Sequence, residues 1–94
     1  MFRTALIVLL FAAAPALAQE AILKKGPGVD DVTVTCGICH TLNYIRMNSP
    51  FLTPAGWKGE VTKMQQAFGA PFDDETAGEI VKYLSANYAA PPKP

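Results

Sequence analysis

The stretch Cys36-Gly37-Ile38-Cys39-His40 holds both cysteines and the single histidine of this 94-residue sequence. Two thiols three positions apart, followed at once by an imidazole, are typical of a c-type haem attachment site, in which the thiols form thioether bonds and the histidine binds iron. On a helical turn this spacing puts both sulfurs on one side of the backbone. We therefore predict one covalent haem c attached to Cys36 and Cys39, with His40 as an axial iron ligand.

Three other interpretations of this pentapeptide fit the sequence less well. A redox-active dithiol belongs at the strand-to-helix junction of a βαβ unit, and the sequence does not alternate strands with helices. A structural zinc site takes four nitrogen or sulfur ligands, and the chain offers three. A disulfide across two intervening residues closes too short a loop to add much stability.

The N-terminal residues have the three parts of a secretory signal peptide. Arg3 supplies an early positive charge, residues 5–14 are an unbroken apolar run, and Ala16-Leu17-Ala18 is a small-x-small cleavage site. The apolar run is too short to span a bilayer. We therefore predict a signal peptide over 1–18 and a periplasmic cytochrome c domain over 19–94, with no membrane anchor after cleavage.

Size and charge narrow the functional classes further. A domain as small as residues 19–94 is only marginally stable unless a cross-link or a bound cofactor adds stability. A covalent haem would add it. Eight basic residues balance eight acidic residues, so the sequence has no basic field for nucleic acid or anionic lipid. We expect no nucleic-acid partner, and only a local docking patch for a redox partner.

Hydrophobic spacing and breaker residues predict an all-α fold, a small cytochrome c-like domain of three or so helices around one covalent haem. The first helix is expected over 29–40, after the breaker Gly26-Pro27-Gly28. The alternating residues 32–35 could form a strand, but no partner strand is visible. Residues 41–53 contain asparagine, serine and proline, and are expected to form a loop on the proximal side of the haem.

Two later helices carry clear start signals. Thr53 and Pro54 suit an N-cap and a first helical position, and this helix is expected to end at Gly69. One of its faces is apolar and is expected to be buried: Trp57, Val61, Met64 and Phe68. Asp73 should cap a last helix. The apolar positions of that helix are Ala77, Ile80, Val81, Tyr83, Leu84 and Tyr88.

A second protein ligand to the iron would have to be a methionine, because the sequence has no second histidine. Met1 would leave with the signal peptide, and Met47 follows His40 too closely to reach the opposite haem face without wrapping around its edge. Met64 lies farther along, on the expected buried face, where a methionine is otherwise a core residue. We predict His40 and Met64 as the axial pair, with Met47 or an open iron site as alternatives.

Other residues are weaker candidates for haem contacts. Trp57, Tyr44 and Arg46 carry donors for haem propionates, although Trp57 is equally well explained as a core residue and Arg46 as a solvated one. A backbone carbonyl in the segment 48–51 is a candidate acceptor for the second ring nitrogen of His40.

Several segments together carry a family likeness that covers nearly all of residues 19–94. They are Gly26-Pro27-Gly28-Val29, residues 36–45, Met47-Asn48-Ser49-Pro50-Phe51, Trp57, Val61, Lys63-Met64, Gly69-Ala70-Pro71 and residues 80–84. This pattern resembles the monohaem cytochrome subunit of bacterial sulfite dehydrogenases (sulfite:cytochrome c oxidoreductases), with Arg46 where proline would be expected. The tryptophan, the Lys-Met pair and the Gly-Ala-Pro turn are also similar to haem domains of quinohaemoprotein amine dehydrogenases.

The first resemblance implies a larger periplasmic oxidoreductase partner that carries molybdopterin, oxidises sulfite and passes electrons singly to this haem. It also implies a downstream acceptor such as another cytochrome c. In this interpretation the chain is an electron-transfer subunit without catalytic residues of its own. An independent electron-shuttle cytochrome would have the same motif, and a haem-based small-ligand binder or sensor would need an open iron site.

Overall fold

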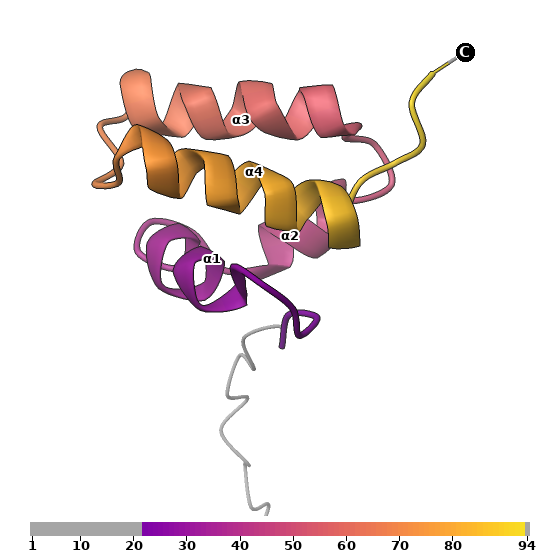
Figure 1. Cartoon of the computed structure of the whole chain (residues 1–94), viewed down its shortest axis with the longest axis horizontal. Helices are drawn as coiled ribbons and strands as arrows, with labels where there is room; N and C mark the ends of the chain where they lie inside the picture. Colours follow the sequence, from indigo (N-terminus) through magenta and orange to yellow (C-terminus); the bar gives the residue numbers. More distant parts are fainter. Residues whose placement is uncertain (1–21, 94) are drawn as a thin grey trace, which may run out of the picture.

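An antiparallel helix pair forms the framework of the computed structural model, which describes residues 22–93 (Figure 1). The helices in order are α1 (Val29–Cys36), α2 (Asn43–Asn48), α3 (Pro54–Gln66) and α4 (Asp74–Asn87). α3 and α4 make the pair, and α4 also packs against α1. Residues 22–93 contain no strand, so the predicted all-α class is confirmed, with four helices where three or so were expected.

The predicted signal peptide, residues 1–18, lies outside the described residues. Within residues 22–93, none of the helices has the length and apolar character needed to cross a membrane.

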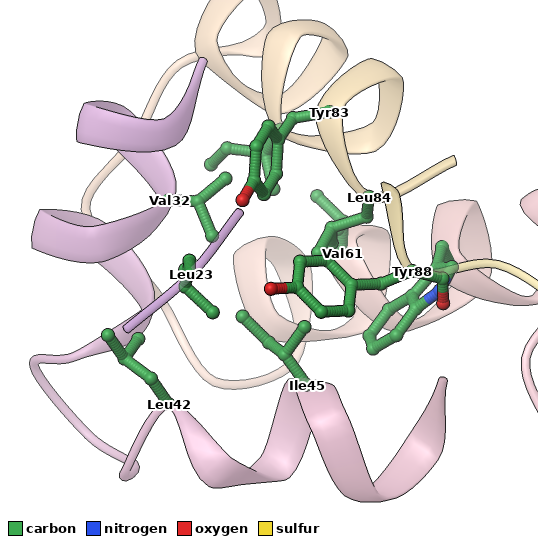
Figure 2. Close-up of a cluster of buried hydrophobic side chains, with 10 residues drawn as sticks. Leu23, Val32, Leu42, Ile45, Val61, Tyr83, Leu84 and Tyr88 are labelled. Carbon is green, nitrogen blue, oxygen red and sulfur yellow. The ribbon is translucent and has the colours of Figure 1, made fainter. Parts of the chain in front are cut away.

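The core gathers around α4, as its apolar spacing predicts. Ile80, Tyr83 and Leu84 are buried, and Tyr88 just beyond the helix is buried as well. The other elements each contribute apolar side chains to this cluster, and Figure 2 shows several converging on the two tyrosines and Leu84: Leu23, Val32, Leu42, Ile45 and Val61. Burial of these side chains is the main term that stabilises so small a domain.

Side-chain caps start α3 and α4 where the sequence predicts. The Thr53 hydroxyl accepts a hydrogen bond from the Gly56 backbone N–H at 3.2 Å, and Pro54 occupies the first helical position. The Asp73 carboxylate accepts a bond from the Thr76 N–H at 2.7 Å. That bond favours the charged carboxylate and lowers the pKa of Asp73 below its ordinary value.

The segment before α1 is tied to α4 by the two tyrosines. The Tyr83 hydroxyl donates to the Lys24 carbonyl at 2.5 Å, and the Lys24 N–H donates to the Tyr88 hydroxyl at 2.8 Å. Gly28 then turns the chain into α1 with a φ of 90°, and a Cβ there would meet the Tyr83 Cβ at 3.2 Å. The predicted breaker is therefore confirmed, and its last glycine allows α1 to approach α4 closely.

Two predicted helix ends and one predicted loop were wrong. α1 ends at Cys36 rather than His40, because Gly37 is a poor helix former and buried Leu42 draws the chain back into the core. The expected loop over 41–53 contains α2, whose buried Ile45 stabilises a short helix despite its polar neighbours. α3 ends at Gln66, three residues before Gly69, whose φ of 66° provides the chain reversal.

Candidate functional site

The pentapeptide lies at the C-terminal end of α1 and in the turn that follows. Cys36 is the last residue of the helix and is half-buried, whereas Cys39 and His40 are exposed. Gly37 lies so close to the preceding turn that a Cβ would come within 2.7 Å of the Thr33 carbonyl oxygen. A glycine between the cysteines therefore lets the chain leave the helix tightly, with both thiols free.

A cavity of about 510 Å³ opens beside this turn. Its volume falls within the range of roughly 300–1,000 Å³ that is usual for small-molecule and cofactor sites. Cys36, Cys39, His40 and Met64 all line it, so the structure brings the four predicted site residues to one surface. The remaining wall is mainly apolar and includes Ile45, Trp57, Val61, Phe68, Ala70, Phe72, Ile80 and Leu84.

The two candidate methionines have different environments. Met64 lies near the end of α3, is half-buried and lines the cavity. Met47 lies on α2 with 70% of its surface exposed, and it is not among the residues that line the cavity. This difference favours Met64 wherever a thioether is needed inside the cavity.

The apolar face predicted for α3 is buried only over its first half. Trp57 and Val61 are in the core, but Phe68, just past the helix, has 71% of its surface exposed. The expectation that Phe68 is buried was therefore wrong. Phe68 and Met64 both line the cavity, which separates the end of this face from the core.

A polar strip crosses the otherwise apolar wall. The Tyr44 ring stacks on the His40 ring, with centroids 5.6 Å apart and planes 23° apart. Its hydroxyl donates to Glu60 Oε2 at 3.1 Å, and Glu60 Oε1 pairs with Lys63 Nζ at 3.0 Å. Desolvation and the Glu60 carboxylate raise the pKa of Tyr44, which keeps the hydroxyl a donor.

Glu60 and Lys63 also line the cavity and were not expected there from the sequence. A helical wheel would have found Glu60, which lies one turn before Met64 on the same side of α3. The wall residues Phe72 and Leu84 could not be found in that way, because they reach the cavity only through the packing of α4 against α3.

The weaker candidates for haem contacts lie in different environments in the structure. Trp57 Nε1 donates to the Tyr88 carbonyl at 2.8 Å in the core, so its N–H is already used. Arg46 is exposed and does not line the cavity. The Asn48 carbonyl accepts bonds from the N–H groups of Phe51 and Leu52, both at 2.9 Å. A carbonyl of the segment 48–51 as partner of His40 stays a prediction.

The environment of Cys36 opposes dithiol redox chemistry. Burial raises the pKa of its thiol to about 11. The thiolate is the nucleophile in thiol exchange, and reactive Cys-x-x-Cys motifs lower this pKa with a helix N-terminus or nearby cations. Here Cys36 lies instead at a helix C-terminus, where the helix dipole disfavours negative charge.

Residues 22–93 contain no group of three or more His, Cys, Asp or Glu side chains that could hold a metal ion. Neither a scan of protein-family models nor a search of curated proteins found a match for this chain.

Proposed function

We propose that this chain is a periplasmic monohaem c-type cytochrome that transfers electrons for a larger oxidoreductase. The observation that carries the proposal is the shared cavity. The cavity is mainly apolar and its volume is in the range usual for cofactor sites. Its wall contains two free thiols, one imidazole and one thioether. This donor set fits a covalently attached haem better than it fits a zinc site or a reactive dithiol.

Cys36 and Cys39 would hold the group through thioether bonds, and His40 and Met64 would bind its iron. A haem bound in this way supplies a reversible one-electron couple. The choice of a neutral imidazole and a neutral thioether favours a relatively high reduction potential. The protein's task is then to keep both ligands in place.

The other wall residues define the environment of the site. Val61, Phe72, Ile80 and Leu84 would exclude water from one side, which strengthens electrostatic interactions inside the cavity. Glu60 is paired with Lys63 and accepts from Tyr44, so the polar strip does not leave an uncompensated charge on the wall. This arrangement suits an electron carrier, which needs a stable environment in both oxidation states.

The partner is proposed from the family resemblance. A sulfite dehydrogenase catalytic subunit that carries molybdopterin would donate electrons, and another cytochrome c would accept them. The chain has balanced charge, so docking would depend on shape and apolar contact rather than long-range steering. Ile38 lies between the two cysteines and has 60% of its surface exposed, which makes it the proposed contact point.

Stopped-flow reduction by the sulfite dehydrogenase catalytic subunit tests this function. We expect rapid reduction with weak dependence on ionic strength, slower reduction of Ile38→Asp, and an unchanged rate for the control Phe51→Asp. Like Ile38, Phe51 is exposed, at 75%, and does not line the cavity, but it lies after α2 rather than between the two cysteines. Reduction of the isolated protein by sulfite, with no partner present, would show that the chain is more than a carrier.

A further inference from the structure

We propose that Gln65 is a positioning residue that keeps Met64 at the cavity by fixing the connection between α3 and α4. This inference rests on the proposed function, because it concerns the retention of Met64 as an iron ligand. Gln65 itself does not line the cavity and acts only through its neighbours.

The Gln65 side chain makes two hydrogen bonds across the connection. Its Nε2 donates to the Phe72 carbonyl at 3.1 Å and to Asp74 Oδ1 at 2.9 Å. The first partner lies in the connection and the second begins α4. One amide group therefore joins the end of α3 to the start of α4, directly beside Met64 in sequence.

The backbone closes the same connection at Met64. The Ala70 N–H donates to the Met64 carbonyl at 2.9 Å, and the Phe72 N–H donates to the Ala70 carbonyl, also at 2.9 Å. Gly69, with its φ of 66°, allows the chain to turn back. The Gln65 bond to the Phe72 carbonyl holds the far side of this turn, so the side-chain and backbone bonds support each other.

Met64 needs such support because of its place in the helix. It lies two residues before the end of α3, where carbonyls have no partner within the helix and the last turn frays readily. Phe68, Ala70 and Phe72, all in the connection, line the cavity together with Met64. Opening of the connection would therefore move Met64 and one wall of the cavity together.

Gln65→Glu is the most direct variant, because it keeps the shape of the side chain, removes both donors and places a carboxylate beside Asp74. Gln66→Glu is the matched control: it makes the same chemical change at the next position, which is exposed and has no side-chain hydrogen bond within residues 22–93. Gln65→Lys has a donor that Gln65→Glu lacks, and it should therefore behave like the wild type. Asp74→Ala, compared with Glu75→Ala, removes only one acceptor and provides a milder test if Gln65→Glu does not fold.

Two readouts on the haem-loaded protein test the proposal. Carbon monoxide can bind reduced iron only when Met64 has left, so its binding rate reports the open population. Amide hydrogen exchange at Ala70 reports the connection itself. We expect both rates to rise roughly fivefold to tenfold in Gln65→Glu, as the loss of about one net hydrogen bond would give. In Asp74→Ala both rates should rise less. In Gln66→Glu, Glu75→Ala and Gln65→Lys they should not rise.

Faster carbon monoxide binding with unchanged exchange at Ala70 would mean that Gln65 does not act through the connection, and would overturn the proposal. Faster exchange at Ala70 with unchanged carbon monoxide binding would mean that Gln65 only stabilises the connection, and would overturn the positioning role. If neither the exchange rate at Ala70 nor the carbon monoxide binding rate changed, the positioning role would be overturned as well, while the proposed electron-carrier function would stand. Wild-type protein without covalent haem would refute the proposed function first, and this inference with it.

Discussion

Met64 and Met47 carry the same functional group in two different environments. Met64 is half-buried on the cavity wall, and Met47 is exposed on α2. We predict that Met64→Ala abolishes the weak long-wavelength absorption of a methionine bound to ferric iron and allows carbon monoxide to bind the reduced protein. Met47→Ala is the control and should change neither. Loss of the absorption in Met47→Ala alone would assign the ligand to Met47 instead.

The Tyr83 hydroxyl gives the stability of the domain a specific dependence on alkaline pH. Burial, followed by the neighbouring Tyr88, raises the pKa of Tyr83 to about 12. The unfolded chain loses this proton near pH 10, so the folded state binds more protons between the two values and its stability falls as the pH rises through that window. Below about pH 10 the contribution is fully present.

We therefore predict that Tyr83→Phe lowers the free energy of unfolding at pH 8, through loss of the bond to the Lys24 carbonyl, by about 1 kcal/mol. Between pH 8 and pH 11 the variant should lose less additional stability than the wild type. Urea unfolding at both pH values measures this. Parallel losses in the two proteins would show that the ionisation of Tyr83 does not affect stability.

At the scale of helices, replacing glycine by alanine is expected to stabilise the domain at two positions and to destabilise it at a third. Gly59 and Gly78 lie inside α3 and α4, and a Cβ at either would meet nothing within 4 Å. Each alanine there should stabilise the domain by about 0.5–1 kcal/mol, since glycine is the more flexible residue in the unfolded chain. Gly69 also has open space, but its φ of 66° strains any L side chain.

Gly69→Ala should therefore destabilise the domain by about 1 kcal/mol, although no atom stands in its way. Thermal unfolding of the three single variants tests the contrast. A stabilising effect of Gly69→Ala would show that the reversal between α3 and α4 can adopt another backbone conformation.

The helices also show where sequence patterns predict structure and where they do not. The starts of α3 and α4 follow from Thr53 and Asp73, because capping is a local interaction between residues three positions apart. The end of α1 and the presence of α2 depend on Leu42 and Ile45, which are buried by residues distant in sequence. Local signals cannot report such tertiary burial, and so 41–53 was expected to be a loop.

For the whole molecule, the four residues that the sequence predicts as haem contacts line one cavity, and the packing of the helices brings them there. Cys36, Cys39 and His40 follow from one contiguous motif, and Met64 from helical spacing. Glu60 was missed although it lies on the same side of α3 as Met64, whereas Phe72 and the Gln65 contacts could not be predicted from spacing, because they arise from the antiparallel packing of α3 and α4. The exposed Phe68 shows the limit of spacing arguments: an apolar face can end at a cavity rather than in the core.

As a whole molecule, the chain is proposed to be exported and to carry one covalent haem on Cys36 and Cys39. The most direct test is the intact mass of the denatured, reduced protein purified from a periplasm that matures c-type cytochromes. We predict the mass of residues 19–94 plus one haem, and the mass of the polypeptide alone for the variant with both Cys36→Ala and Cys39→Ala. A wild-type mass equal to the polypeptide alone would contradict the claim.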